Sequence, residues 1–177
     1  MKTSIKFLCA FLFCSVLFST NSYSQEFRNV IKTNPVGLAF GNFNVTYEKV
    51  LDTKSSLLFD AQYMYQLFGT DIKAGGLGLA YRYYFTHAKR EVPTGFYVNP
   101  QLSYSFGNLE DSNAQKQSFG IFGIGAEIGY QWAWDSGFTL DLGIGPNYSI
   151  ITGDVGDSFD KTSGILPSAT VAVGFAF

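Results

Sequence analysis

The sequence predicts an all-β protein, an eight-stranded antiparallel up-and-down transmembrane β-barrel. Three observations predict it. Apolar residues alternate with small or polar residues through most of the chain, which is the pattern of strands with one apolar face. The chain begins with an export signal, and it ends on an alternating strand with an aromatic terminus. This combination is typical of bacterial barrels, in which every backbone group is paired within the closed sheet.

The first 24 residues are predicted to be a secretory signal. Lys2 and Lys6 precede an apolar run over residues 7–18, and Ser22 and Ser24 supply small residues where signal peptidase cleaves. The run is too short for a membrane-spanning helix, which needs about 20 residues. We therefore expect a cleaved signal peptide over 1–24 and a barrel domain over 25–177.

Both cysteines, Cys9 and Cys14, lie inside this signal. Cys14 raises the alternative of a lipoprotein, but the bulky residues 11–13 before it disfavour that cleavage. The exported chain then has no thiol for a disulfide or a metal site. Cleavage removes two of the 12 basic residues and none of the 14 acidic ones, which leaves a net charge of −4. This balance argues against a nucleic-acid partner.

Eight segments show the alternation, and each is bounded by turn residues. The segment 138–150 is the clearest, because every second residue is apolar and every residue between is small or polar. The segment 29–41 is the least regular, and Pro35 predicts a bulge within it. The predicted strands cover residues 29–41, 43–48, 57–67, 76–85, 96–106, 122–134, 138–150 and a last strand from about 166 to 177.

The last strand carries Val171, Val173, Phe175 and Phe177 on one face. We interpret Phe175 and Phe177 as the terminal assembly signal for the barrel-insertion machinery, which places the protein in the outer membrane of a Gram-negative bacterium. Closure requires this strand to pair with the first, because an open edge in lipid leaves backbone groups unpaired.

The connections between strands are of two kinds. Outer loops are expected near Gly41 and at 68–73, 107–117 and 152–164, and inner turns at 52–55, 86–94 and 135–136. The longest connections fall on the outer side, as in bacterial outer-membrane barrels.

A soluble, ligand-holding barrel of the lipocalin type is the structural alternative. An eight-stranded barrel has an interior just wide enough to be filled by side chains. The apolar face carries most of the 18 Phe and 11 Tyr residues and both Trp residues, which would overfill such an interior. We therefore expect the apolar face to point outward into lipid, with Tyr and Trp near the strand ends as interfacial girdles.

No catalytic, cofactor-binding or metal-binding residues are predicted, and we expect no enzyme. The single histidine, His87, lies in an inner turn, far from any outer-rim nucleophile. Asp154, Asp157 and Asp160 recur at every third residue, whereas the calcium-loop signature places acids at every second. The glycine runs at 75–78 and 123–125 lie inside strands with no helix following, so they predict no phosphate site.

An interior polar network is predicted from the inward faces. Register arithmetic over the turns sets Asp60 opposite Arg82 and Glu48 opposite Asp60, and it brings Glu127 to a similar height. Arg82 is therefore expected to form a salt bridge with Asp60, Glu48 or Glu127, as a structural plug rather than as a gate or selectivity filter. The predicted network comprises Glu48, Asp60, Arg82, Glu127 and Asp141.

The chain resembles small barrels of the OmpA/OmpX type over its whole exported length. Residues 31–38 (IKTNPVGL) and 44–49 (NVTYEK) are similar to an uncharacterised family of small outer-membrane barrels. The resemblance implies a porin-like or structural surface barrel without catalytic residues.

These observations lead to one functional expectation with two alternatives. We expect a monomeric integral outer-membrane protein with a structural or surface-interaction role, and with outer-membrane lipids and an extracellular ligand at its outer loops as partners. The alternatives are a lipid-modifying enzyme of the outer leaflet and a narrow passive channel for small solutes. An outer-rim nucleophile with its base would favour the enzyme, and an open lumen would favour the channel.

Overall fold

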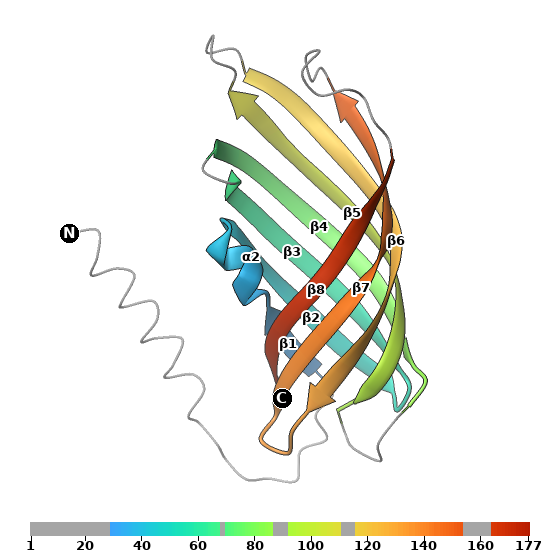
Figure 1. Cartoon of the computed structure of the whole chain (residues 1–177). Coiled ribbons are helices and arrows are strands. Elements are labelled where there is room, and N and C mark those ends of the chain that lie inside the picture. The colour runs from blue at the N-terminus through green and yellow to red at the C-terminus, as the bar shows by residue number, and fades with distance from the viewer. Residues whose placement is uncertain (1–28, 68–69, 87–91, 111–115, 154–163) are drawn as a thin grey trace, which may run out of the picture.

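The computed structural model describes residues 29–67, 70–86, 92–110, 116–153 and 164–177. The predicted signal peptide, His87 and the three spaced aspartates of the last outer loop lie outside these residues. Eight strands form one closed antiparallel barrel, in which each strand pairs with its neighbours in sequence (Figure 1). The strands are β1 (Asn29–Thr33), β2 (Asn42–Asp52), β3 (Ser55–Leu67), β4 (Thr70–Tyr84), β5 (Gly95–Glu110), β6 (Lys116–Ala133), β7 (Phe138–Gly153) and β8 (Gly164–Ala176).

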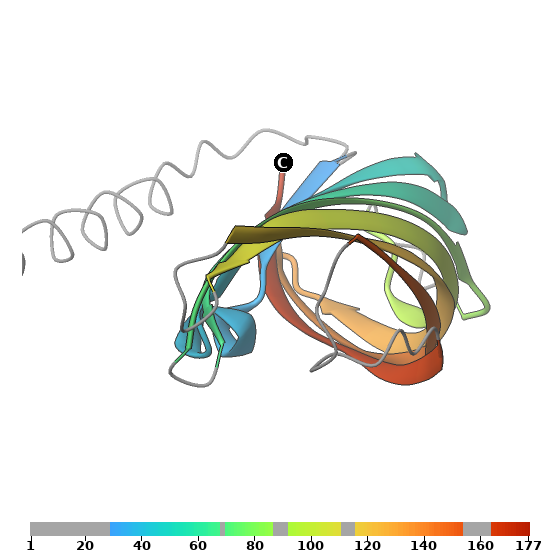
Figure 2. The same ribbon diagram turned by 90° about the horizontal axis from the view of Figure 1, so that it is seen from above.

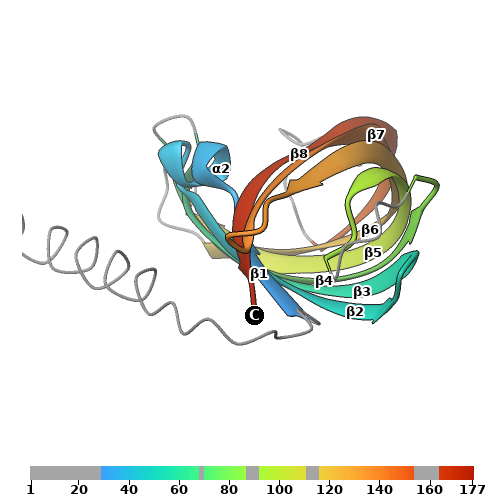
Figure 3. The same ribbon diagram turned by 90° about the horizontal axis from the view of Figure 1, so that it is seen from below.

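The predicted fold class is confirmed, including the closure of the last strand on the first. β1 pairs antiparallel with β8 from Val30↔Ala176 to Thr33↔Val173. The backbones of Asn29 and Phe177 extend this contact with two hydrogen bonds of 2.9 and 3.2 Å. The two strands meet at the end of the barrel where the chain terminates, as the view from below shows (Figure 3).

The first strand is much shorter than the sequence predicts. Pro35 produces a short helix, α2 (Pro35–Ala39), rather than a bulge in a long strand. Proline suits the first turn of a helix, because its missing N–H would be unpaired there in any case. Asn34 caps this helix, and its Oδ1 accepts a hydrogen bond from the Gly37 backbone N–H at 2.8 Å. Seen from above, α2 lies beside the ring of strands (Figure 2).

The connection between β3 and β4 also differs from the expectation. A loop was expected over 68–73, but β3 continues to Leu67 and β4 begins at Thr70. A register shift between Met64 and Gln66 lies just before this connection. Both features change which residues face each other across these two strands, with consequences for the interior described below.

The two faces of the barrel have the chemistry that the alternation predicts. Aromatic and aliphatic side chains point outward on every strand. Exposed examples, one from each strand in order, are Ile31, Phe43, Phe59, Leu77, Phe96, Ile128, Ile144 and Ile165. Small and polar side chains point inward. Within the described residues, no helix is both long and apolar enough to cross a bilayer.

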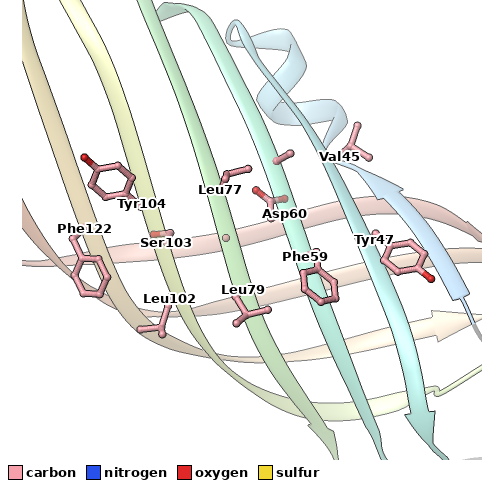
Figure 4. A pocket seen from close by; sticks show the side chains of 12 residues that line it. Val45, Tyr47, Phe59, Asp60, Leu77, Leu79, Leu102, Ser103, Tyr104 and Phe122 are labelled. Atoms are coloured by element: carbon pink, nitrogen blue, oxygen red, sulfur yellow. The ribbon is translucent and has the colours of Figure 1, made fainter.

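Two rows of outward side chains border a shallow apolar groove on the outer face. One row includes Tyr47, Phe59 and Leu79, and the other includes Tyr104 and Phe122 (Figure 4). The groove crosses β2 to β6, and its walls are almost entirely carbon. It is a shallow recess in an apolar surface.

Candidate functional site

Two basic and two acidic side chains meet inside the barrel. Lys32 of β1, Glu48 of β2, Arg82 of β4 and Asp141 of β7 point inward, and each is at most 2% exposed. These strands are not all neighbours, so only the closed barrel brings the four together. We refer to these four residues as the ion cluster.

Asp141 accepts hydrogen bonds from both cations of the cluster. Its Oδ2 lies 2.8 Å from Lys32 Nζ and 2.7 Å from Arg82 Nη1. Its Oδ1 accepts a hydrogen bond from the Tyr97 hydroxyl at 2.7 Å. Both carboxylate oxygens are therefore satisfied, which is what a buried charge requires.

Glu48 is the second acid of the cluster. Its Oε2 forms an ion pair with Lys32 Nζ and lies 3.9 Å from Arg82 Nη1. Its Oε1 accepts hydrogen bonds from Ser56 Oγ and, at 2.9 Å, from the Tyr84 hydroxyl. Two positive and two negative charges thus make the ion cluster neutral as a unit.

Neutral side chains fill the lumen around the ion cluster. Gln131 Oε1 accepts hydrogen bonds from Lys32 Nζ and Arg82 Nη1, and its Nε2 donates to the Pro93 carbonyl at 2.9 Å. The Arg82 guanidinium lies 3.8 Å from the Tyr97 ring centroid, which is a cation–π contact. Tyr84 packs against Tyr97 in an edge-on geometry. These side chains are fully buried, so they plug the lumen toward the end where the chain terminates.

The structure brings together three of the five residues of the predicted network. Glu48, Arg82 and Asp141 belong to the ion cluster, whereas Asp60 and Glu127 do not contact Arg82 within the described ion pairs. The expected register between Asp60 and Arg82 is wrong: Asp60 pairs with Gly78, and Arg82 pairs with Ser56. Relative to a loop centred near residue 71, the register is displaced by four residues, because β3 runs to Leu67, β4 begins at Thr70, and the register shifts between Met64 and Gln66.

The register between β2 and β3 is also displaced, by two residues. Asp60 lies opposite Thr46, while Glu48 lies opposite Leu58. Asp60 therefore lies two residues farther than Leu58, the partner of Glu48, from the end where the chain terminates. Its Oδ2 accepts hydrogen bonds from Thr46 Oγ1 at 2.6 Å and Asn44 Nδ2 at 3.3 Å.

Glu127 stands on the wall formed by β6 and is 2% exposed. Its Oε1 accepts a hydrogen bond from Ser168 Oγ, and its Oε2 accepts one from Thr170 Oγ1 at 2.8 Å. It faces Asn99 directly across the β5–β6 ladder. Glu127 is thus held by neutral hydroxyl groups of β8.

The predicted network does not include several of the buried side chains that fill the lumen around the ion cluster. Tyr84, Tyr97 and Gln131 continue the inward-facing series of their strands, so alternation alone assigns their faces. Lys32 follows the outward-facing Ile31 and so faces inward. The bulge expected at Pro35 left open which face each residue of this strand occupies. The meeting of these side chains across the lumen depends on the register of eight strands, which no local pattern contains.

A cavity of about 290 Å³ lies above the ion cluster. All eight strands contribute to its wall, and most of the lining side chains are polar. We call this cavity the cup. Its lining includes Lys32, Arg82 and Asp141 of the ion cluster, together with Asp60 and Glu127. In the described part of the chain, no group of three or more His, Cys, Asp or Glu side chains could hold a metal ion.

One comparison with known proteins gives a match. No curated protein and no solved structure shows significant similarity to this chain. Residues 10–158 match the model of a family described as "Protein of unknown function (DUF3575)". This match covers most of the chain, including β1 to β7. This chain forms an eight-stranded barrel. It belongs to the family of proteins of unknown function DUF3575.

Proposed function

We propose that the protein is a plugged, non-conducting barrel of the bacterial outer membrane, with a structural or surface-interaction role at its outer loops. The observation that carries the proposal is the apolar outer face on all eight strands. Contiguous apolar surface of this extent marks contact with a membrane or with other proteins. Through β1 the barrel also closes on itself, which pairs backbone groups of β2 and β8 as spanning lipid requires.

The buried ion cluster supports the non-conducting part of the proposal. A channel needs a continuous aqueous path, whereas the lumen at the height of Arg82 is filled by fully buried side chains. The β5–β6 and β7–β8 connections, which the sequence predicts as the long outer loops, would then carry the surface role. Their central residues, 111–115 and 154–163, lie outside the described part of the chain.

Two measurements test the proposal. First, the purified protein is reconstituted in planar bilayers, and we expect insertion without a large, stable conductance. Second, an epitope is inserted between Gly153 and Gly164 in one variant and in the 135–136 turn in a matched variant. Antibody should bind intact cells of the first variant, and the second only after the outer membrane is opened.

Opposite outcomes would reject separate parts of the proposal. A large steady conductance would favour the passive channel. Equal labelling of both epitopes in intact cells would contradict the orientation, and recovery of folded protein in the soluble fraction would contradict membrane insertion.

A further inference from the structure

The buried carboxylate of Glu127 has no positively charged partner among the described residues. It is 2% exposed, and its recorded partners are the hydroxyl groups of Ser168 and Thr170. A buried charge is normally paired, because removing it from water is costly. The two cations of the ion cluster do not fill this role, since Glu48 and Asp141 already neutralise them.

A second carboxylate, that of the half-buried Asp60, lies in the same cup and also has no positively charged partner among the described residues. Asp60 lines the cavity from β3, and its recorded partners are the neutral side chains of Thr46 and Asn44. The cup therefore holds two negative charges beyond those that the ion cluster balances. A cation inside the cup would supply the missing charge.

Unpaired hydrogen-bond acceptors also face the cup. Asn99 is 3% exposed and lies directly opposite Glu127, and its Oδ1 has no hydrogen-bond partner. Asn42 also lines the cup, and its Oδ1 has no hydrogen-bond partner either. One donor, Arg82 Nε, also lacks a partner, but the charge of that guanidinium is already balanced. The unpaired groups of the cup are thus mainly acceptors, which suit a ligand rich in N–H donors.

The size and layout of the cup narrow the class of ligand. A volume of about 290 Å³ corresponds to roughly ten water molecules at about 30 Å³ each, which accommodates a small organic molecule. Asp60 and Glu127 stand on strands separated by β4 and β5, so a ligand that uses both needs two positive ends. We propose that the cup binds a small linear diamine, with one ammonium group at Glu127 and Asn99 and the other at Asp60.

The proposal is tested by calorimetric titration of the purified protein in zwitterionic detergent micelles with 1,4-diaminobutane. We expect saturable binding, and weaker binding by about tenfold in Glu127→Gln and in Asp60→Asn, because each substitution replaces a charge-assisted contact with a neutral one. Asp52→Asn is the matched control. It removes one negative charge from the exposed end of β2, outside the cup, and binding should not change.

Three analogues separate the parts of the proposal. 1,4-Butanediol has the same length without charge, butylamine has a single ammonium group, and succinate has the opposite charge. Equal binding of the diol or of succinate would overturn the cationic site, and equal binding of butylamine would overturn the two-ended ligand. Far-ultraviolet circular dichroism establishes that each variant is folded, so unchanged binding in both cup variants also overturns the proposal. The assay does not depend on membrane orientation, so its outcome is independent of the proposed surface role.

Discussion

At the scale of single residues, the most consequential feature is the balance of charge in the ion cluster. Lys32 and Arg82 both contact Asp141, and each is almost completely shielded from water. Such an arrangement is favourable only as a complete set, because one missing partner leaves another charge buried and unpaired.

Asp141→Asn should therefore destabilise the barrel by about 3–5 kcal/mol, the usual cost of breaking a buried ion pair. The measurement is the free energy of unfolding in urea, in detergent micelles. The control is Asp52→Asn at the exposed end of β2, where the amide oxygen can accept from the Lys54 N–H and the amide NH2 can donate to Ser55 Oγ. Equal stability of Asp141→Asn and the wild-type protein would show that the cluster does not depend on this charge.

Leu142 tests the direction in which the residues of β7 face. It lies on the outer face and is 40% exposed, whereas Asn147 on the same strand faces the cup. Leu142→Arg should cost roughly 2–4 kcal/mol of folding into lipid vesicles, because it places a charge against hydrocarbon. Asn147→Ala should cost far less. Equal losses in the vesicle refolding assay would contradict the proposed membrane-facing surface.

At the scale of elements, the close approach of β6 and β7 depends on glycine. A Cβ built on Gly145 would lie 1.9 Å from the Ala126 carbonyl oxygen, and backbone cannot move aside as a side chain can. The neighbouring Pro146 has no N–H to donate, and the ladder between Ile128↔Ile144 and Gly125↔Asn147 records no pairs. The two strands can therefore approach this closely only because residue 145 has no side chain.

Gly145→Ala should thus destabilise the barrel by about 1–3 kcal/mol or more, the cost of overpacking a tight site. The matched substitution is Gly78→Ala, whose added methyl group would lie 3.2 Å from the Asp60 Cβ, a contact much less severe than the one at Gly145. Chemical unfolding of both variants measures the difference. A larger loss for Gly78→Ala would show that the β6–β7 approach is not the constraint.

At the scale of the whole molecule, the outward aromatic rings form a band near the end where the chain terminates. Tyr130 and Trp132 pack at 4.5 Å between ring centroids, and Trp134 packs against Phe138 at 5.3 Å. Amphipathic rings prefer the boundary between hydrocarbon and headgroups. This band should therefore mark one interface of the bilayer.

Quenching of tryptophan fluorescence measures the depth of this band directly. The chain has two tryptophans, Trp132 and Trp134, and both lie on the outer face near the β6–β7 turn. In vesicles of brominated lipid, bromine near the headgroup should quench more strongly than bromine near the end of the acyl chain. Stronger quenching from the chain ends would place the band at mid-bilayer and contradict the proposed depth.

The sequence by itself determined the number of strands, their order and the face of nearly every residue. Alternation is local, because successive side chains of a strand point to opposite sides, so a pattern within ten residues places Arg82, Asp141 and Glu127 on the polar face of their strands. The volume of the aromatic residues on the other face then makes this polar face the interior. Closure into a barrel then follows for strands that face lipid, because an open edge there would leave backbone groups unpaired.

Only the tertiary structure decided which interior residues meet. Contacts across the lumen depend on the register at every strand pair, and a difference of a few residues at the 68–69 connection moved Asp60 out of reach of Arg82. Pairing with β2 and β8 fixed the position of Lys32, and strands far apart in the sequence brought Asp141 to it. Register errors accumulate from turn to turn, whereas the alternation within each strand does not, and this is why the faces could be predicted and the ion cluster could not.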